Sequence, residues 1–248
     1  MSKKPNRNLN IVVTNITGAT AKSTFSKHGV VSQIPNAIRM SIEDWNSGDG
    51  IADIEIGAKN FYKIAAQINT DSSQSFVIDI GASNSKAMFK HFEDLELTRD
   101  LIDWWIIPTR AGTKERIDTL KTIDLLLAMS VVPCKIIVIA QMVDDVDQFD
   151  FNFEQLKESL DQIGVFFAPE AVLFNEVFNM LKNSDKSVFD IANNMPDFTS
   201  LKKECYGNEQ KLLKIGHDML IYSLARKAAS NLLSVFNSTP IAESLVQE

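Results

Sequence analysis

The chain has few of the residues that cross-link secreted proteins or hold transition metals. Its two cysteines, Cys134 and Cys205, lie far apart without partner histidines at metal-ligand spacing, which argues against a disulfide framework and a zinc site and favours a reducing cytoplasm. The three histidines, His28, His91 and His217, are scattered, and none has an acid or a nucleophile at a spacing typical of a catalytic group. The sequence therefore offers no hydrolase triad.

Long apolar runs and an excess of positive charge are absent as well. No apolar run reaches the roughly 18 to 20 residues of a membrane-spanning helix, and a polar N-terminus leads straight into a short apolar segment. We therefore expect a cytoplasmic protein without a membrane span. The formal net charge of −7 argues against a surface coated in basic residues, so any DNA contact must be local.

Short apolar runs and helical segments alternate along the chain. Six runs mostly lack an alternating pattern, which is typical of strands buried on both faces; they cover 10–14, 37–42, 75–80, 103–107, 135–140 and 171–174. Helical spacing of apolar residues is found at 114–128, 153–163 and 210–236. This order predicts an α/β fold, with a mostly parallel sheet flanked by helices and a long C-terminal helix. We expect the apolar stripe of that helix to face the core, the alternative being a membrane or partner site. The length suits one domain over 1–248, with 1–8 as a flexible N-terminal segment.

The segment NITGATAKST, residues 15–24 and here named the lysine loop, follows the first predicted strand. A strand that ends in a glycine-containing turn and opens into a helix directs backbone N–H groups at one point, where a phosphate can bind. Lys22 and Ser23 stand in the order in which such loops place a lysine on the phosphates and a hydroxyl on Mg²⁺. The standard pattern has glycine where this chain has Ile16 and Ala21, so an ordinary helix N-terminus is the alternative.

The lysine loop resembles the NQKGGVGKTT signature of the ParA/MinD family of deviant Walker ATPases. The ten residues align without a gap, and four are identical: Asn15, Gly18, Lys22 and Thr24. The likeness spans roughly 9–145, and the unusual loop, the IDIGASNSK segment and the size resemble the StbB-like plasmid stability ATPases more than standard ParA. It implies a P-loop NTPase-like fold and an ATP- and Mg²⁺-dependent switch in plasmid stability, partition or DNA positioning. It also implies a homodimer with bound nucleotide and a plasmid-stability partner protein.

The resemblance assigns site residues. The nucleotide-binding positions of the loop are Thr17, Gly18, Ala19, Thr20, Ala21, Lys22, Ser23 and Thr24. Ser23 would ligate Mg²⁺ together with Asp79, which matches the family's strand-borne aspartate. Gln141 stands where an asparagine usually contacts adenine, and adenine is favoured over guanine although residues 141–144 faintly resemble the NKxD motif.

Departures from the family pattern limit the expected chemistry. The family's signature lysine aligns with Thr17, which carries no charge, so we expect slow or absent hydrolysis with Lys22 as the catalytic cation. The methyl group of Ala21 lets the loop keep its shape only if φ is negative or the backbone shifts. Glu43 or Asp44 would position the attacking water, the alternative being a solvated turn.

Four lysines form the best candidate for a DNA-binding surface: Lys202, Lys203, Lys211 and Lys214. In ParA-like proteins a basic face near the C-terminal helices binds DNA nonspecifically through its phosphates. The alternative is that these lysines only solvate a helix. The competing function for the whole chain is a degenerate, non-catalytic P-loop protein that acts as an interaction scaffold.

Overall fold

The computed structural model describes residues 8–42, 54–55, 57, 60–71 and 73–245. The predicted flexible segment, residues 1–8, lies outside the described residues except for Asn8. Both candidates for positioning the attacking water, Glu43 and Asp44, also lie outside them. Within the described ranges, no helix combines the length and the apolar character that crossing a bilayer requires.

The described strands form one seven-stranded sheet in the order β3-β2-β4-β1-β5-β6-β7, and every pair in it is parallel. The strands are β1 (Asn10–Thr14), β2 (Ala37–Ile42), β3 (Ile54–Glu55), β4 (Ser75–Ile80), β5 (Trp104–Thr109), β6 (Ile136–Ala140) and β7 (Phe166–Phe167). The predicted parallel sheet is confirmed. Strands β1, β2 and β4 have the bounds that were predicted.

The last predicted strand, 171–174, is wrong. This segment contributes only an isolated bridge between Val143 and Leu173, and the strand is β7, a few residues earlier. The backbone N–H groups of Ala168 and Val172 still donate to β6, to the carbonyls of Val138 and Ala140. Residues 169 and 170 form a bend between these two donors, so the regular ladder is interrupted there.

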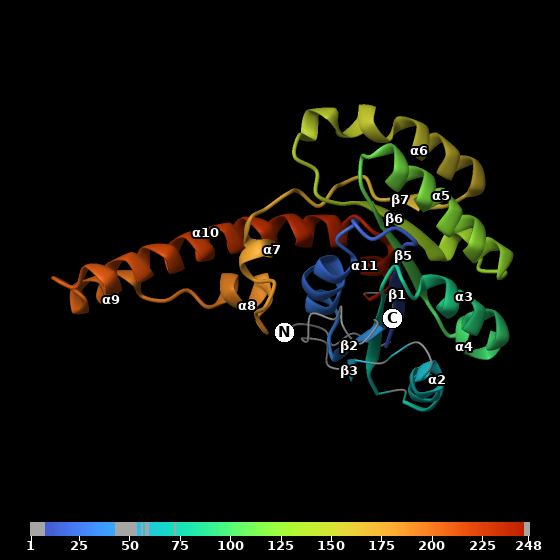
Figure 1. The fold of residues 1–248 in the computed structure, drawn as a ribbon, viewed down its shortest axis with the longest axis horizontal. Coiled ribbons are helices and arrows are strands. Elements are labelled where there is room, and N and C mark those ends of the chain that lie inside the picture. Colours follow the sequence, from blue (N-terminus) through green and yellow to red (C-terminus); the bar gives the residue numbers. More distant parts are fainter. Residues whose placement is uncertain (1–7, 43–53, 56, 58–59, 72, 246–248) are drawn as a thin grey trace.

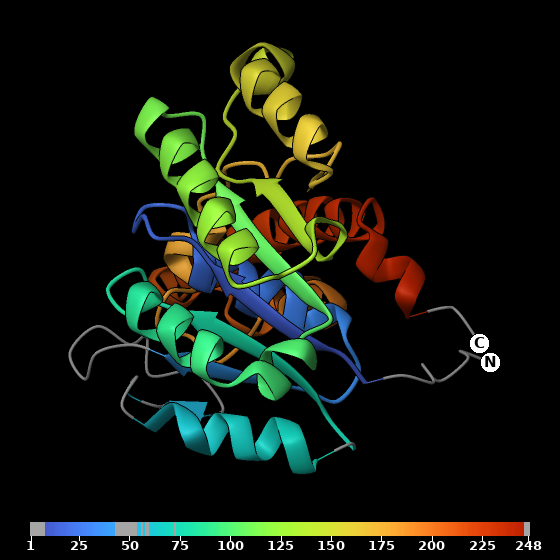
Figure 2. The ribbon, with the colours of Figure 1, turned by 90° about the vertical axis from the view of Figure 1, so that its right-hand side faces the viewer.

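Helices cover both faces of the sheet (Figure 2), which explains why the strands read as continuous apolar runs. Side chains of one face, such as Val12, share a core with α2 (Phe61–Thr70), α3 (Ser85–Asp94), α5 (Thr113–Ala128) and α6 (Phe149–Ile163). Those of the other face, such as Ile11 and Val13, pack with a π-helix (Phe25–Val30), α7 (Val177–Met180), α8 (Val188–Asn193), α10 (Glu209–Asn237) and α11 (Pro240–Ser244). The shorter helices are α1 (Lys22–Thr24), α4 (Glu96–Asp100) and α9 (Phe198–Glu204). The three predicted helices correspond to α5, α6 and α10.

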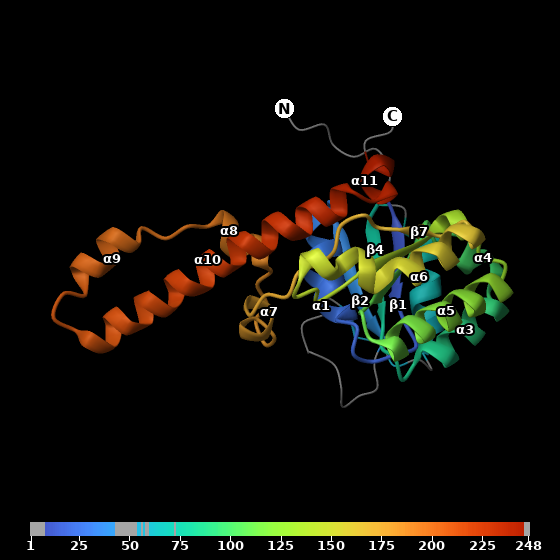
Figure 3. The same cartoon turned by 90° about the horizontal axis from the view of Figure 1, so that it is seen from above.

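The C-terminal helix α10 only partly covers the sheet. It has 29 residues and is therefore roughly 44 Å long, about twice the length of the strands. Its second half, from Ala225 to Phe236, is buried against the body. Its first half and α9 project from the body as an arm, residues 198–220 (Figures 1 and 3). The prediction that the whole apolar stripe faces the core is thus wrong for the arm, where Leu213 is 69% exposed.

Candidate functional site

The carboxyl ends of four neighbouring strands bring the predicted nucleotide-site residues to one edge of the sheet. Strands β4, β1, β5 and β6 are adjacent and parallel, so the segments that leave their carboxyl ends lie in the same order along that edge. Asp79 lies next to the last residue of β4, the lysine loop comes directly after β1, and Gln141 comes directly after β6. Ligands of open parallel sheets bind at this edge.

The backbone of the lysine loop takes a conformation that favours glycine. Ala21 has φ 55° and ψ 32°, in the left-handed region. Of the two alternatives expected for this position, a negative φ or a shifted backbone, the structure excludes the negative φ. The left-handed conformation costs roughly 1–2 kcal/mol for a residue with a Cβ. Directly after Ala21 the chain enters α1, and the N–H of Phe25 donates to the Ala21 carbonyl at 2.9 Å.

A buried amide anchors the start of the loop. Asn15 donates through Nδ2 to the carbonyl of Pro108 and to the hydroxyl of Thr119, each at 3.0 Å. Its Oδ1 accepts from the N–H of Thr17 at 3.0 Å and from the hydroxyl of Thr122 at 3.3 Å. The loop is thereby fastened to β5 and α5. Neither helix threonine was predicted from the sequence; their signal is two hydroxyls three residues apart on a helix that packs on the sheet.

The side chain of Lys22 bridges the lysine loop. Its side chain is 5% exposed, and Nζ donates to the carbonyl of Thr17 at 2.5 Å. The ammonium group therefore lies within the turn rather than in solvent. Ser23 and Thr24, which complete α1, are half-buried.

Asp79 is fully buried in an ion pair that was not predicted from the sequence. Its Oδ2 lies 2.6 Å from Nη2 of Arg39 and accepts from the hydroxyl of Ser26 at 2.9 Å. Arg39 Nε also donates to the Ser26 oxygen, at 2.9 Å. The signal in the sequence is an arginine inside an otherwise apolar strand, since a buried guanidinium needs an acid.

The residues fit a magnesium ion shared with phosphates better than an ion held by protein alone. Oδ1 of Asp79 has no hydrogen-bond partner in the described structure, and Ser23 offers a hydroxyl on the loop. Mg²⁺ takes such oxygen ligands in small number and completes its shell with water and substrate phosphates. The described residues contain no cluster of three or more His, Cys, Asp or Glu side chains that could hold a metal ion. The charge of Arg39 weakens the pull of Asp79 on a cation.

Unpaired buried polar atoms gather at this same edge. In the described part of the chain, three buried side-chain atoms lack a hydrogen-bond partner: Oγ1 of Thr20, Oδ1 of Asp79 and Nε2 of Gln141. Each such atom costs about 1–3 kcal/mol, and native proteins contain few of them. All three lie at the carboxyl edge of the sheet, one in the lysine loop and two at the ends of β4 and β6, which makes this edge the candidate ligand site.

A cavity of about 460 Å³ opens at the same edge of the sheet, where the chain leaves β5 and β6, and its volume is within the usual size range of small-molecule sites. Gln141 lies in its wall, together with three carboxylates, those of Glu115, Asp144 and Asp145. Arg110 is the one cation among the lining residues identified, and its Nη1 donates to the carbonyl of Ala19 in the loop at 3.4 Å. Arg110 therefore links the wall of this cavity with the loop.

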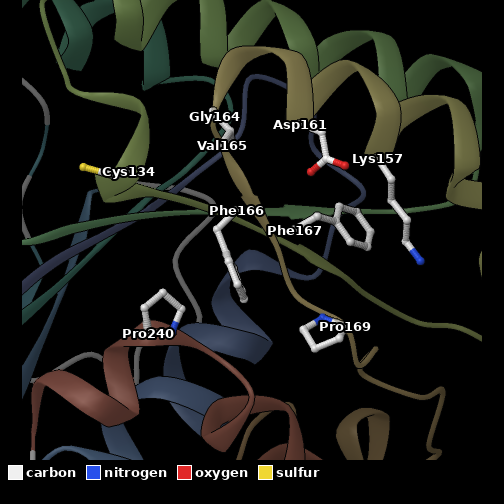
Figure 4. A pocket seen from close by; sticks show the side chains of 9 residues that line it. All are labelled: Cys134, Lys157, Asp161, Gly164, Val165, Phe166, Phe167, Pro169 and Pro240. Atoms are coloured by element: carbon white, nitrogen blue, oxygen red, sulfur yellow. The ribbon is translucent and has the colours of Figure 1, made fainter.

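A cavity of about 590 Å³ lies elsewhere, between α6, β7 and α11 (Figure 4). Phe166, Phe167 and Pro240 line it, and Lys157 and Asp161 project from α6. None of the predicted site residues that the structure describes lines this cavity. We therefore place the candidate site at the carboxyl edge of the sheet, although this cavity is the larger of the two.

The four predicted DNA-binding lysines are exposed on the arm, two on α9 and two on α10. Four acidic residues lie on the arm or directly before it: Asp197, Glu204, Glu209 and Asp218. The arm is therefore not a uniformly basic surface.

Comparison with known proteins reveals similarity in structure only. The sequence matches no protein-family model and no curated protein. An ATP complex of a McdA variant from Cyanothece matches with a TM-score of 0.50 and 14% identity, over 86% of this chain and 96% of that one. The cell division protein MinD of Aquifex aeolicus matches with a TM-score of 0.50 and 12% identity, over the same shares of the two chains. The chain thus has the P-loop NTPase-like fold of these proteins.

Proposed function

We propose that the chain is a ParA-like, ATP-dependent switch in plasmid stability, partition or DNA positioning, with slow or absent hydrolysis. The observation that carries the proposal is that three unpaired buried polar atoms and a lysine-bearing loop lie at the same carboxyl edge of a parallel sheet. The fold shared with McdA, a variant of which is known in complex with ATP, supports the choice of nucleotide. The StbB-like assignment within the family rests on the sequence resemblance.

In this proposal the nucleotide lies along the edge from β1 to β6. Its phosphates contact the loop 17–24, where Lys22 supplies charge and the backbone supplies N–H groups. Its base enters the 460 Å³ cavity, where Nε2 of Gln141 donates to a ring acceptor. The two ribose hydroxyls donate to carboxylates of the cavity.

Adenine is preferred over guanine on the family resemblance alone, since adenine and guanine both present ring acceptors to Gln141. Thermal-shift measurements with ATP and GTP compare the two bases. A larger rise of the melting temperature with ATP supports adenine, and a larger rise with GTP reverses the assignment.

Hydrolysis is expected to be slow because the loop has little positive charge. Lys22 is the only lysine or arginine in the lysine loop, and Thr17 adds none. Mg²⁺, held by Ser23 and Oδ1 of Asp79, would neutralise phosphate charge when bound. The proposed residue for positioning the attacking water is Glu43 or Asp44.

The decisive experiment is equilibrium titration of ATP into the wild type and Lys22→Ala, with and without Mg²⁺. Lys121→Ala, which removes an exposed lysine of α5, is the matched control. We expect the wild type and the control to bind alike, and Lys22→Ala to bind at least tenfold more weakly, because a charge-assisted contact is worth about 1.5–3 kcal/mol. Binding that also weakens without Mg²⁺ supports the assignment of the metal residues.

Absence of ATP binding by the wild type favours the alternative, a non-catalytic P-loop scaffold. Two features support this alternative: the strained Ala21 and the neutralisation of Asp79 by Arg39. Under it, the same edge of the sheet is a remnant of a nucleotide site.

The helical segment after the loop contacts the part of the chain that precedes the arm, and a switch requires such a connection. The π-helix that continues from α1 carries Lys27, whose Nζ donates to the carbonyl of Ser184, and His28, whose Nδ1 accepts from the N–H of Val188 at 3.3 Å. The rings of His28 and Phe178 lie 5.7 Å apart. These contacts reach the segment that leads into α8 and the arm, so a change in the loop has a short path to it.

We further propose that the arm binds DNA nonspecifically or a plasmid-stability partner protein in the nucleotide-bound homodimer. Light scattering with and without ATP measures the dimer directly.

Reversal of the four arm lysines to glutamate tests the DNA contact, with reversal of the exposed Lys86 and Lys90 of α3 as control. Weaker binding with a smaller salt dependence is expected only for the arm variant. Unchanged DNA affinity in the arm variant would exclude the DNA contact and leave a partner protein as the ligand of the arm.

A further inference from the structure

Arg110 lies at the junction of the lysine loop and the cavity, outside the positions that were assigned from the sequence. It comes directly after β5, the strand between β1 and β6 in the sheet, and therefore lies between the loop and Gln141. Its side chain lines the 460 Å³ cavity, and its Nη1 reaches the loop at Ala19. Any ligand with phosphates on the loop and a base in the cavity must pass this guanidinium.

The contact to Ala19 is weak and easily exchanged. At 3.4 Å it is at the long end of an N–H to O hydrogen bond, and it lies at the exposed rim of the loop, where Gly18 and Ala19 are open to solvent. The guanidinium is only partly buried, so it can turn from a neutral carbonyl to a charged acceptor without leaving the cavity wall. Arginine forms shorter, stronger and bidentate hydrogen bonds with phosphate oxygens.

The charges around the site favour the move of the Arg110 guanidinium from the Ala19 carbonyl to a phosphate. The lining residues identified for the cavity include three carboxylates and this one arginine. A triphosphate placed on the loop would meet the charge of Lys22 on one side and the carboxylates of the cavity on the other. A second cation between them offsets the repulsion.

We propose that Arg110 is a phosphate-contacting residue, which leaves the Ala19 carbonyl and binds the phosphate chain of the nucleotide in the same chain. This inference rests on the proposed function, since it assumes a nucleotide on the loop. Because the contact depends on charge, its contribution falls as ionic strength rises.

The test is calorimetric titration of ATP into the wild type, Arg110→Ala and Arg110→Lys, at low and high salt. Arg99→Ala, which removes an arginine of α4 paired with Asp100, is the matched control. We expect Arg110→Ala to weaken ATP binding about tenfold to a hundredfold at low salt, and less at high salt. Arg110→Lys, which keeps the charge but loses the bidentate geometry, should retain part of the affinity, and Arg99→Ala all of it. Thermal unfolding should be unchanged in the two Arg110 variants.

Wild-type affinity in Arg110→Ala overturns the inference while the proposed function stands. Equal losses in Arg110→Ala and Arg110→Lys also overturn it, because they assign the effect to the shape of the cavity wall rather than to charge. Failure of the wild type to bind ATP overturns the inference and the proposed function together.

Discussion

At the scale of single residues, the site contains side chains and backbone angles that lower the stability of the fold. Ala21 takes a glycine conformation, and Asp79 is buried with one oxygen unpaired. Natural proteins tolerate such features mainly at functional sites. Two substitutions measure these costs.

Replacement of Ala21 by glycine is expected to raise the free energy of unfolding by about 1 kcal/mol, because glycine takes a φ of 55° without strain. Ala19→Gly in the same loop is the control, since Ala19 has no positive φ and glycine only adds freedom to the unfolded chain there. Urea denaturation compares the two. A loss of stability in Ala21→Gly as large as that in Ala19→Gly would show that the turn is unstrained.

Replacement of Arg39 by methionine is expected to cost about 3 kcal/mol or more, because it leaves the carboxylate of Asp79 buried without its cation. The double variant Arg39→Met/Asp79→Asn removes both charges and should recover part of that loss. Chemical denaturation of the two single variants and the double variant gives the coupling energy. Additive effects would mean that the two charges do not stabilise each other.

At the scale of elements, the helix after the lysine loop is unusual. After one turn of α-helix it continues as a π-helix, Phe25–Val30, a rare form that is frequent at functional sites. Gly29 lies in this segment, and a Cβ built there would be 2.5 Å from ring carbons of Phe25, which is 1% exposed. The wide turn and the glycine together make room for a buried aromatic ring beneath the loop.

Gly29→Ala is therefore expected to destabilise the protein by about 1–3 kcal/mol, as overpacking of a core does. Gly216→Ala makes the same change in α10, where no atom lies within 4 Å of the new methyl group, and should stabilise by about 0.5–1 kcal/mol through helix propensity. Thermal unfolding of both variants checks the opposite signs. Stabilisation in both would mean that Phe25 moves aside without cost.

At the scale of the whole molecule, the body and the arm differ in how they are held. The body has a sheet covered on both faces, whereas the arm consists of α9 and the first half of α10 with few buried side chains. Exposed apolar residues, including Tyr206 at 91% and Leu213 at 69%, lie on or next to its helices. Local stability depends on burial, so one continuous helix should have two stabilities.

Hydrogen exchange measures this difference. Amides of residues 225–236 are expected to exchange at least tenfold more slowly than those of 212–220, because the former open only with the body. The two halves of α10 serve as mutual controls for helix propensity. Uniform protection along the helix would contradict the description of the arm as a separate, weaker unit.

The sequence by itself determined the sheet, the main helices and the position of the lysine loop. Strands buried on both faces must be apolar throughout, and amphipathic helices must repeat at 3.6 residues, so both are visible locally. The bounds of β1, β2 and β4 can be predicted for this reason, and so can the placement of Lys22 at a helix start. The prediction of a strand at 171–174 failed because a bend at 169–170 interrupts the ladder before it.

Only the tertiary structure decided which side chains meet at the site. Arg39 and Asp79 are 40 residues apart and Arg110 and Ala19 are 91 apart, so no local pattern connects either pair. Likewise, the arm projects because α10 is about twice as long as the strands, a comparison of dimensions rather than of residues. Contacts of this kind depend on strand order, which the chain establishes only when the sheet forms.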